Sequence, residues 1–560
     1  MKVTLPKNAS LKFINLCKIF FTEQVKFDNE SIVVKQQVLN QLLEVEFASK
    51  KFNIQLHNAL LFSLVYPVNE EIYKLTDQVM QKLVQTVSRK VVENADEYYN
   101  SGISGSMVCA RFGLLLNQWL LIQNTDMLQL SSIEGENSDL VSKLTFTLNP
   151  VEQELMPDDA CYYNEWKEMY LGSISDNTKL LTYYVNACLQ MTGSISYKES
   201  IFSGFDFYTQ FLLDKKLQGL SLGRQTKGEI HFHPNGIQKK TDLELVIKQG
   251  KPKAFVLTTA EKINLVNLAR GTMASLLRET DTFSYAQIPE TELFDMHNGI
   301  SVALYYMIPE QKFALQSYVG YLLFKNGVPM AYGGCWLFAR QAAFGVNVLP
   351  PYRGGESANV VCQLLRLYFH RFQLQQFTVD PYQIGQGNED GISSGAFWFY
   401  YKLGFRPMQK QYAELADAEM LKMAIDKSYK TPLNTLIILA NSELYWKQKD
   451  SPAVYYPLLK VSEVISRYVC DYYAGNRRLA LNAAKLKYMK QVKKTLSKNS
   501  FLNNLLLTLE AIGAFEKLSA YALQKVCEAY TLKGKNEANA FIEIQKVKKY
   551  CELFESKIFT

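Results

Sequence analysis

Hydrophobic residues recur at helical spacing along the first third of the chain. The runs VVKQQVLNQLLEVEFASKKF (33–52) and EEIYKLTDQVMQKLVQTVSRKVVENADEYY (70–99) place apolar side chains three and four residues apart, which predicts amphipathic helices. ARFGLLLNQWLLIQ (110–123) is apolar nearly all round, so a buried central helix is expected there. We therefore predict a helical region over residues 1–195, with a role in packing, capping or partner binding and no catalytic constellation.

The pattern changes over residues 196–260, where apolar and polar residues alternate and PNG (234–236) and QGKP (249–252) are turn signals. Alternation of this kind predicts a small region of short strands and turns. In a strand, His231 and His233 would point to the same face and could bind a metal ion. The sequence has no cysteine or third histidine close by, so two ordinary imidazoles are the preferred interpretation.

Residues 261–412 carry the clearest strand pattern. GYLLF (320–324) and MAYGGCWLF (330–338) flank an Asn-Gly step, which is typical of a tight hairpin, and FGVNVLP (344–350) follows as a third strand. A helical run (357–372), a short strand (375–381) and a helix ending near Gly404 come next. This order predicts an α/β (α+β) domain with a mixed sheet and packed helices. Residues 413–560 return to helical spacing, so the sheet is expected between two largely helical regions.

Composition fits a folded protein of several domains. The chain has 560 residues, 48% hydrophobic and 21% charged, and this length suggests about three domains. The net charge of +7 is too small to argue for nucleic-acid binding by the whole chain. Nine cysteines without a CxxC spacing indicate reduced thiols, so a cytoplasmic location is expected. No apolar run of about 18 residues occurs, which predicts that no segment spans a membrane.

One basic stretch stands out against this mild balance. RRLALNAAKLKYMKQVKKTLSK (477–498) contains eight lysines and arginines and no acidic residue. Such a run is typical of a solvated helix face, and the alternative is a docking surface for an anionic partner such as RNA or an acidic carrier protein.

The order of elements over residues 315–407 resembles the GNAT acyltransferase fold, and three motifs carry the resemblance. These are VLPPYRGG (348–355), FTVDP (377–381) and FYYKLGF (399–405). A closer likeness, through FKNGVP (324–329), RGGESA (353–358) and SGAFWFY (394–400), is to a group of uncharacterised bacterial proteins with a GNAT-like domain. The resemblance implies a GNAT-like domain over 261–412 and acyl-CoA as a donor substrate. It places the donor pyrophosphate at Arg353, Gly354, Gly355, Ser357 and Ala358, and it matches Tyr400 to the tyrosine that protonates the leaving thiolate.

Glu356 departs from the pyrophosphate motif of that family, which has glycine at this position. Backbone N–H groups at a helix N-terminus bind phosphate, and glycine allows close approach. A carboxylate adds bulk and like charge there, although it also complements the helix dipole. Glu356 is therefore a helix-capping residue, a polar site residue or base, or a side chain that points away from an intact acyl-CoA site.

We therefore expect an N-acyltransferase that moves an acyl or aminoacyl group to an amine. Glu356 or Asp380 would accept the proton and Tyr400 would donate one to the leaving group. Acyl-CoA, a carrier protein or an aminoacyl-tRNA would be the donor, and no separate cofactor or metal is required. The alternative is a non-catalytic binding or scaffold module with a degenerate GNAT-like fold. An open cleft between 344–349 and 377–380 favours the enzyme, and a cleft filled by Glu356 and aromatic side chains favours the module.

Overall fold

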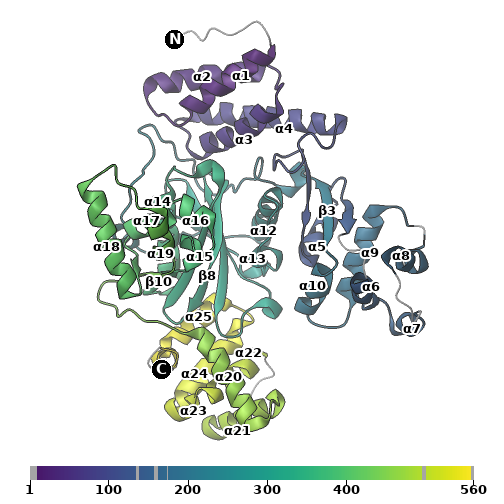
Figure 1. Ribbon diagram of the computed structural model, residues 1–560, viewed down its shortest axis with the longest axis vertical. Coiled ribbons are helices and arrows are strands. Elements are labelled where there is room, and N and C mark those ends of the chain that lie inside the picture. Colours follow the sequence, from purple (N-terminus) through teal and green to yellow (C-terminus); the bar gives the residue numbers. More distant parts are fainter. Residues whose placement is uncertain (1–8, 134–137, 157–161, 173, 495–499, 556–560) are drawn as a thin grey trace.

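The computed structural model describes residues 9–133, 138–156, 162–172, 174–494 and 500–555. The elements form four groups, distinguished by their place in the molecule (Figure 1). Helices α1–α4 lie at one end of the molecule, a large sheet lies in the middle, a smaller α/β unit lies beside the sheet, and helices α20–α26 lie at the opposite end.

The N-terminal helices share one buried core with the central sheet. The core includes residues from Phe13 in the first helix, through the sheet, to Phe541 in the C-terminal helices, and α3 packs against β8 and the short helix η4. The expected single helix over 33–52 is two helices, with a break at 45–49. The bounds are α1 Ala9–Glu23, α2 Asn29–Glu44, α3 Lys50–Val65 and α4 Glu70–Glu93.

Residues 107–217 form a second unit with its own core, centred on Trp166 and Tyr184. Its three-stranded antiparallel sheet has the order β1-β3-β2. The helix expected over 110–123 begins only at Leu114, because the preceding residues pair as a strand. The elements are β1 Met107–Arg111, α5 Leu114–Ile122, β2 Gln129–Ile133, α6 Ser138–Thr145, α7 Pro150–Glu154, α8 Tyr163–Leu171, α9 Asn177–Gln190, α10 Ile195–Ser203, β3 Phe207–Leu212 and η1 Lys215–Leu217.

The central sheet is mixed, as predicted. It has nine strands in the order β11-β12-β10-β9-β8-β7-β6-β5-β4. Every neighbouring pair is antiparallel except β9 and β10. Strands β6 and β10 are buried over their whole length, and β7 and β8 over nearly all of it, so these four alternate little between apolar and polar residues. The strands are β4 Lys253–Ala254, β5 Glu292–Asp295, β6 Ile300–Tyr305, β7 Ser317–Lys325, β8 Val328–Phe338, β9 Gln341–Val348, β10 Gln376–Val379, β11 Arg406–Pro407 and β12 Leu444–Lys447.

Helices cover the sheet, and α14 connects its parallel pair. The amphipathic run after the PYRGG turn forms α14 as predicted, and Gln373 ends it in the left-handed conformation. The helices between the strands are α11 Leu243–Ile247, α12 Thr259–Ser275, α13 Asp281–Ser284, η2 Ile288–Glu290, η3 Pro309–Gln311, η4 Pro350–Tyr352, α14 Ser357–Phe372, α15 Pro381–Ile384, α16 Glu389–Ser393, α17 Ala396–Lys402, α18 Lys410–Ile425 and α19 Leu433–Leu439.

The short strands expected over residues 196–260 include β3, but from residue 228 to residue 257 they are mostly not formed. In this interval the chain is irregular except for α11 and the two residues of β4. His231 and His233 therefore lie in a loop that crosses the ends of β6 and β7, and its backbone bonds other loops and turns instead of forming a ladder. The amide of His233 donates to Pro67 O at 2.8 Å, for example.

The parallel strands β9 and β10 pair over a short stretch only. They pair only through Gln341–Gln376, Ala342–Phe377 and Ala343–Thr378. β9 continues to Val348 while β10 ends at Val379. The outer half of β9, toward the N-terminus of α14, therefore continues without β10 beside it, and it is half-buried or exposed except at Phe344.

The C-terminal helices dock on the sheet through buried charges. Lys312 forms an ion pair with Glu290 and donates to Lys533 O at 3.1 Å, and Glu537 N donates to Glu290 Oε2 at 2.8 Å. All four side chains are buried. Burial lowers the pKa of Lys533 to about 8. The bounds are α20 Leu458–Tyr473, α21 Arg477–Val492, α22 Ser500–Ala511, α23 Ala514–Lys517, α24 Ala520–Lys533, α25 Glu537–Lys546 and α26 Lys548–Glu552.

A search of the described helices finds none that is both long and apolar enough to cross a bilayer.

The turn between β7 and β8 generates a test of the fold. Asn326 and Gly327 both have positive φ, 51° and 77°, as the predicted two-residue hairpin turn requires. A Cβ at Gly327 would lie 2.3 Å from Gln225 O, whereas a Cβ at Gly395, also at positive φ (69°), meets nothing within 4 Å.

Gly327→Ala should therefore destabilise the protein more than Gly395→Ala. A residue with a Cβ costs about 1–2 kcal/mol in the left-handed conformation at either position, and only Gly327→Ala adds a clash with backbone, worth roughly 1–3 kcal/mol more. Thermal unfolding followed by circular dichroism measures the difference. Equal losses in the two variants would show that the loop at Gln225 does not press on the turn.

Candidate functional site

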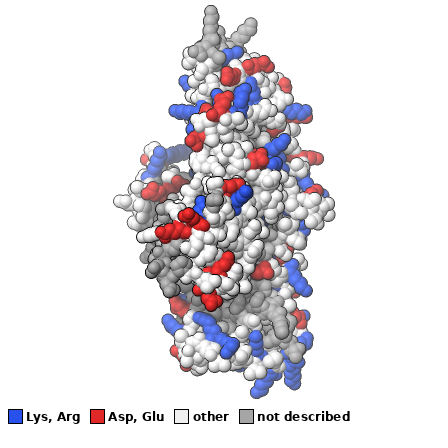
Figure 2. Space-filling view, turned by 90° about the vertical axis from the view of Figure 1, so that its right-hand side faces the viewer, with Lys and Arg blue, Asp and Glu red and all other residues white. Residues whose placement is uncertain are grey.

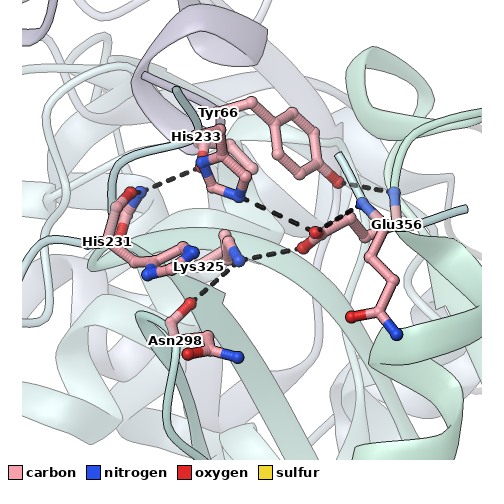
Figure 3. A network of polar contacts seen from close by, with 9 residues as sticks. Tyr66, His231, His233, Asn298, Lys325 and Glu356 are labelled. Atoms are coloured by element: carbon pink, nitrogen blue, oxygen red, sulfur yellow. Dashed lines mark hydrogen bonds and ion pairs between the residues drawn. The ribbon is translucent and has the colours of Figure 1, made fainter. Parts of the chain in front are cut away.

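Glu356 lies at the centre of a buried polar network, in the turn that begins α14 (Figure 3). The residue as a whole is only 4% exposed. Oε2 accepts a hydrogen bond from Lys325 Nζ at 2.9 Å, and Oε1 accepts one from the backbone N–H of Gln238 at 3.1 Å. Glu356 is the N-cap residue of the helix, but its carboxylate makes no capping hydrogen bond and turns inward to these partners.

Lys325 brings the matching charge from the last position of β7. Its side chain is 1% exposed, and Nζ also donates to Asn298 O at 2.9 Å, in the turn between β5 and β6. Burial lowers the pKa of Lys325, and the Glu356 carboxylate works against this shift. The pair therefore joins two turns of the sheet to the start of α14.

Tyr66, at the end of α3, fills the space in front of the turn. The backbone N–H of Glu356 donates to Tyr66 Oη at 3.1 Å. A Cβ placed on Gly355 would lie 2.5 Å from that oxygen and 2.8 Å from the ring. Glycine is thus needed at 355 because a tyrosine approaches closely, which is the same property that would admit a phosphate in an open site.

His233 completes the network from the irregular loop. Its Nε2 lies 3.7 Å from Glu356 Oε1, and its ring packs edge-on against Tyr66 and His231, with centroids 5.5 and 4.7 Å apart. The side chain is 3% exposed. Within the described part of the chain, no group of three or more His, Cys, Asp or Glu side chains is arranged to hold a metal ion.

The surroundings keep the Glu356 carboxylate ionised. Burial alone would raise its pKa, but the His233 imidazole, the Lys325 ammonium and the N–H of Gln238 together lower it to about 2. A base must reach its substrate, and this carboxylate is both nearly inaccessible and already bonded. The chemistry available to Glu356 here is charge pairing between elements.

The other residues of the turn divide between surface and network. Arg353 is exposed, and its Nε donates to Val348 O at 3.3 Å. Gly354 has φ of 83° and open space around it. Ser357 and Ala358 begin the helix and are half-buried. The turn thus has the shape of an anion cradle, with its inner wall occupied by Tyr66 and Glu356.

Asp380 and Tyr400 stand apart from the network. Asp380 is exposed, and its carboxylate caps α15 by accepting from the N–H of Tyr382 at 2.8 Å. Tyr400 is 3% exposed and packs edge-on against Phe405 at 5.5 Å. Burial raises the pKa of Tyr400, and the nearby Cys335 adds to this shift. In the described part of the chain, neither residue forms a hydrogen bond, ion pair or ring contact with Glu356, so the expected acid and base are not joined in one constellation.

Sequence reasoning missed the partners of Glu356. Lys325 stands just before a hairpin turn, where a lysine is usually exposed, and Tyr66 ends a helix some 290 positions away. A signal was present in FKNG (324–327), where a lysine ends an otherwise apolar strand next to its turn. A buried lysine calls for an acidic partner, but the sequence does not say which of many carboxylates it is.

Comparison with known proteins gives no significant match, whether with family models, with curated proteins or with solved structures.

The Lys325–Glu356 pair generates a double-mutant test. Glu356→Gln and Lys325→Met each leave one buried charge without its partner, and each should cost about 3–5 kcal/mol. The double variant should lose clearly less than the sum, because no charge remains unpaired. Thermal unfolding of the four proteins gives the coupling.

The exposed pair Lys410–Glu414 provides the matched control, with side chains 89% and 67% exposed. The same cycle there should show a coupling of about 0.5 kcal/mol or less. Additive losses at Lys325 and Glu356 would contradict the assigned pair.

The low pKa of Glu356 predicts a loss of stability in acid. Its ordinary value is 4.5 and its value in the fold is about 2. A lowered carboxyl pKa stabilises the fold above pH 4.5, and this contribution disappears as the pH falls toward 2; a shift of this size corresponds to roughly 3 kcal/mol. The difference in unfolding temperature between wild type and Glu356→Gln should therefore shrink between pH 5 and pH 3. A constant difference across this range would contradict the shift.

Proposed function

We propose that this protein is a non-catalytic binding or scaffold protein whose central sheet is a degenerate form of the GNAT-like acyltransferase fold. The observation that carries the proposal is the occupied turn before α14. The protein's own carboxylate stands there in an ion pair with Lys325, and Tyr66 lies against Gly355.

Opening this turn for a donor pyrophosphate would be costly. The phosphate would need the position of Tyr66, and it would approach a carboxylate held ionised at neutral pH by its surroundings. Removing Glu356 from the pair would leave Lys325 buried and charged, a change that typically costs about 3–5 kcal/mol. The ground state thus opposes donor binding by both shape and charge.

A scaffold role agrees with how the other units attach. The sheet shares its core with the N-terminal helices and holds the C-terminal helices through the buried Lys312, Glu290 and Glu537. Figure 2 shows Lys and Arg side chains gathered at the lower end of the molecule, over the C-terminal helices. Binding of an anionic partner to 477–498 stays a prediction; residues 477–492 form α21, and 495–498 lie outside the described residues.

The second candidate is an N-acyltransferase with acyl-CoA, a carrier protein or an aminoacyl-tRNA as donor. One observation favours it: β9 and β10 are parallel and pair over only three positions, and β9 continues toward α14 after β10 has ended. A GNAT-like sheet splays at this place to admit the donor, and Tyr400 lies on α17, beyond β10, as the resemblance expects.

The two candidate functions differ in whether binding of acetyl-CoA requires Arg353. If the turn before α14 is closed, amines should release no free thiol from acetyl-CoA, and Arg353→Ala should leave any affinity for acetyl-CoA unchanged. Isothermal titration and a thiol-release assay measure the two quantities. Saturable binding that Arg353→Ala abolishes, or amine-dependent thiol release, would instead support the acyltransferase.

A further inference from the structure

We propose that a groove at the β11–β12 edge of the sheet binds a small ligand carrying a di- or triphosphate group. The groove lies between the start of α11, the turn from α17 into β11, and strand β12, and its volume is about 710 Å³. This is within the usual range of about 300–1,000 Å³ for ligand pockets. The groove is separate from the turn before α14. The proposal therefore does not depend on whether the protein is an acyltransferase.

The charge of the lining favours an anion. Five cations line the groove, against Asp242 and Glu244: Lys240, Lys402, Arg406, Lys447 and Lys449. Across the described part of the chain, ion pairs are formed by other lysines and arginines, and none involves these five. A net lining charge of about three positive units without compensation attracts a multiply charged ligand.

Arg406 is held in place for such a contact. Its guanidinium lies 4.1 Å from the ring centroid of Tyr401, and Nη1 donates to Tyr401 O at 3.0 Å and to Phe405 O at 2.7 Å. These contacts involve only Nη1 of the Arg406 guanidinium and the face of the group, and they fix its plane. The remaining N–H groups are left for a planar pair of acceptor oxygens, the geometry in which arginine binds phosphate.

An unpartnered donor lies beneath the cations. Trp446 is 6% exposed, and its indole N–H reaches no acceptor among the described residues. The indoles of Trp119 and Trp398, by contrast, donate to Asn267 Oδ1 at 2.9 Å and to Thr431 Oγ1 at 3.1 Å. Trp446 lines the groove, so its N–H can donate to an acceptor that enters there.

Gly404 keeps that donor uncovered. It has φ of 98°, and a Cβ there would lie 3.8 Å from Trp446 Nε1. Thr241 lines the same groove, and its buried hydroxyl has no partner among the described residues. A phosphate group offers several acceptor oxygens, so it can satisfy these donors and the surrounding cations together. The size of the groove favours a nucleotide-sized ligand over a nucleic-acid strand.

The test is titration of the full chain with inorganic tripolyphosphate, followed by calorimetry and tryptophan fluorescence. We expect saturable binding that weakens at least tenfold in Lys402→Ala/Lys449→Ala and several-fold in Trp446→Phe. The matched control is Lys50→Ala/Lys51→Ala, two exposed lysines at the start of α3, which should bind as wild type does. Lys402 and Lys449 are exposed, so an unchanged unfolding temperature will show that the variant is folded.

Three outcomes would overturn the proposal. The first is no saturable binding at millimolar tripolyphosphate, and the second is an equal loss of tripolyphosphate affinity in both lysine variants. The third is displacement of tripolyphosphate by a single-stranded oligonucleotide that binds more tightly and in a salt-dependent way, which would indicate a nucleic-acid surface instead. Acetyl-CoA, which carries a pyrophosphate, separates the two sites. Affinity lost in Arg353→Ala belongs to the turn before α14, and affinity lost in Lys402→Ala/Lys449→Ala belongs to the groove.

Discussion

The ion pair between Lys325 and Glu356 is the interaction on which the centre of this molecule depends. It is fully buried, and each partner makes a further hydrogen bond, to Asn298 O and from the N–H of Gln238. Four chain segments that are distant in sequence therefore meet at one charge pair, and Tyr66 adds a fifth through the N–H of Glu356. Because a buried charge without its partner is far more costly than a lost surface contact, the position of α14 relative to the sheet and the N-terminal helices is fixed there.

The same constraint decides what the turn before α14 offers to a ligand. Its glycines and helix start have the form of a phosphate cradle, yet the inner wall is built from the carboxylate of Glu356 and the ring of Tyr66. The chain's own carboxylate stands beside the helix start and is paired with Lys325. The uncompensated positive charge lies elsewhere, in the groove at the β11–β12 edge and on the C-terminal helices. The proposed binding function follows from this separation between a closed cradle and open cationic surfaces.

Local sequence patterns predicted the elements whose structure is determined by near neighbours. The Asn326-Gly327 step forms the expected tight turn, the run after PYRGG forms α14, and the buried strands of the hairpin form as apolar runs. The HFHPNG segment (231–236) was predicted as strand and is irregular, because the structure gives its N–H and C=O groups other partners: Asn326 bonds both the N–H and the C=O of His231. An alternating pattern indicates which side chains are buried, but it does not indicate which groups form hydrogen bonds with the backbone.

The sequence by itself determined a mixed α/β protein, the hairpin, the start and end of α14, and Glu356 as the residue that does not fit a phosphate site. Only the tertiary structure decided what Glu356 does. Its partners come from α3, the loop before α11 and the end of β7, and no spacing rule links positions so far apart in the chain. Burial converts a lysine and a glutamate that would be ordinary surface charges into an obligatory pair, because the low polarity of the interior leaves neither charge another means of stabilisation.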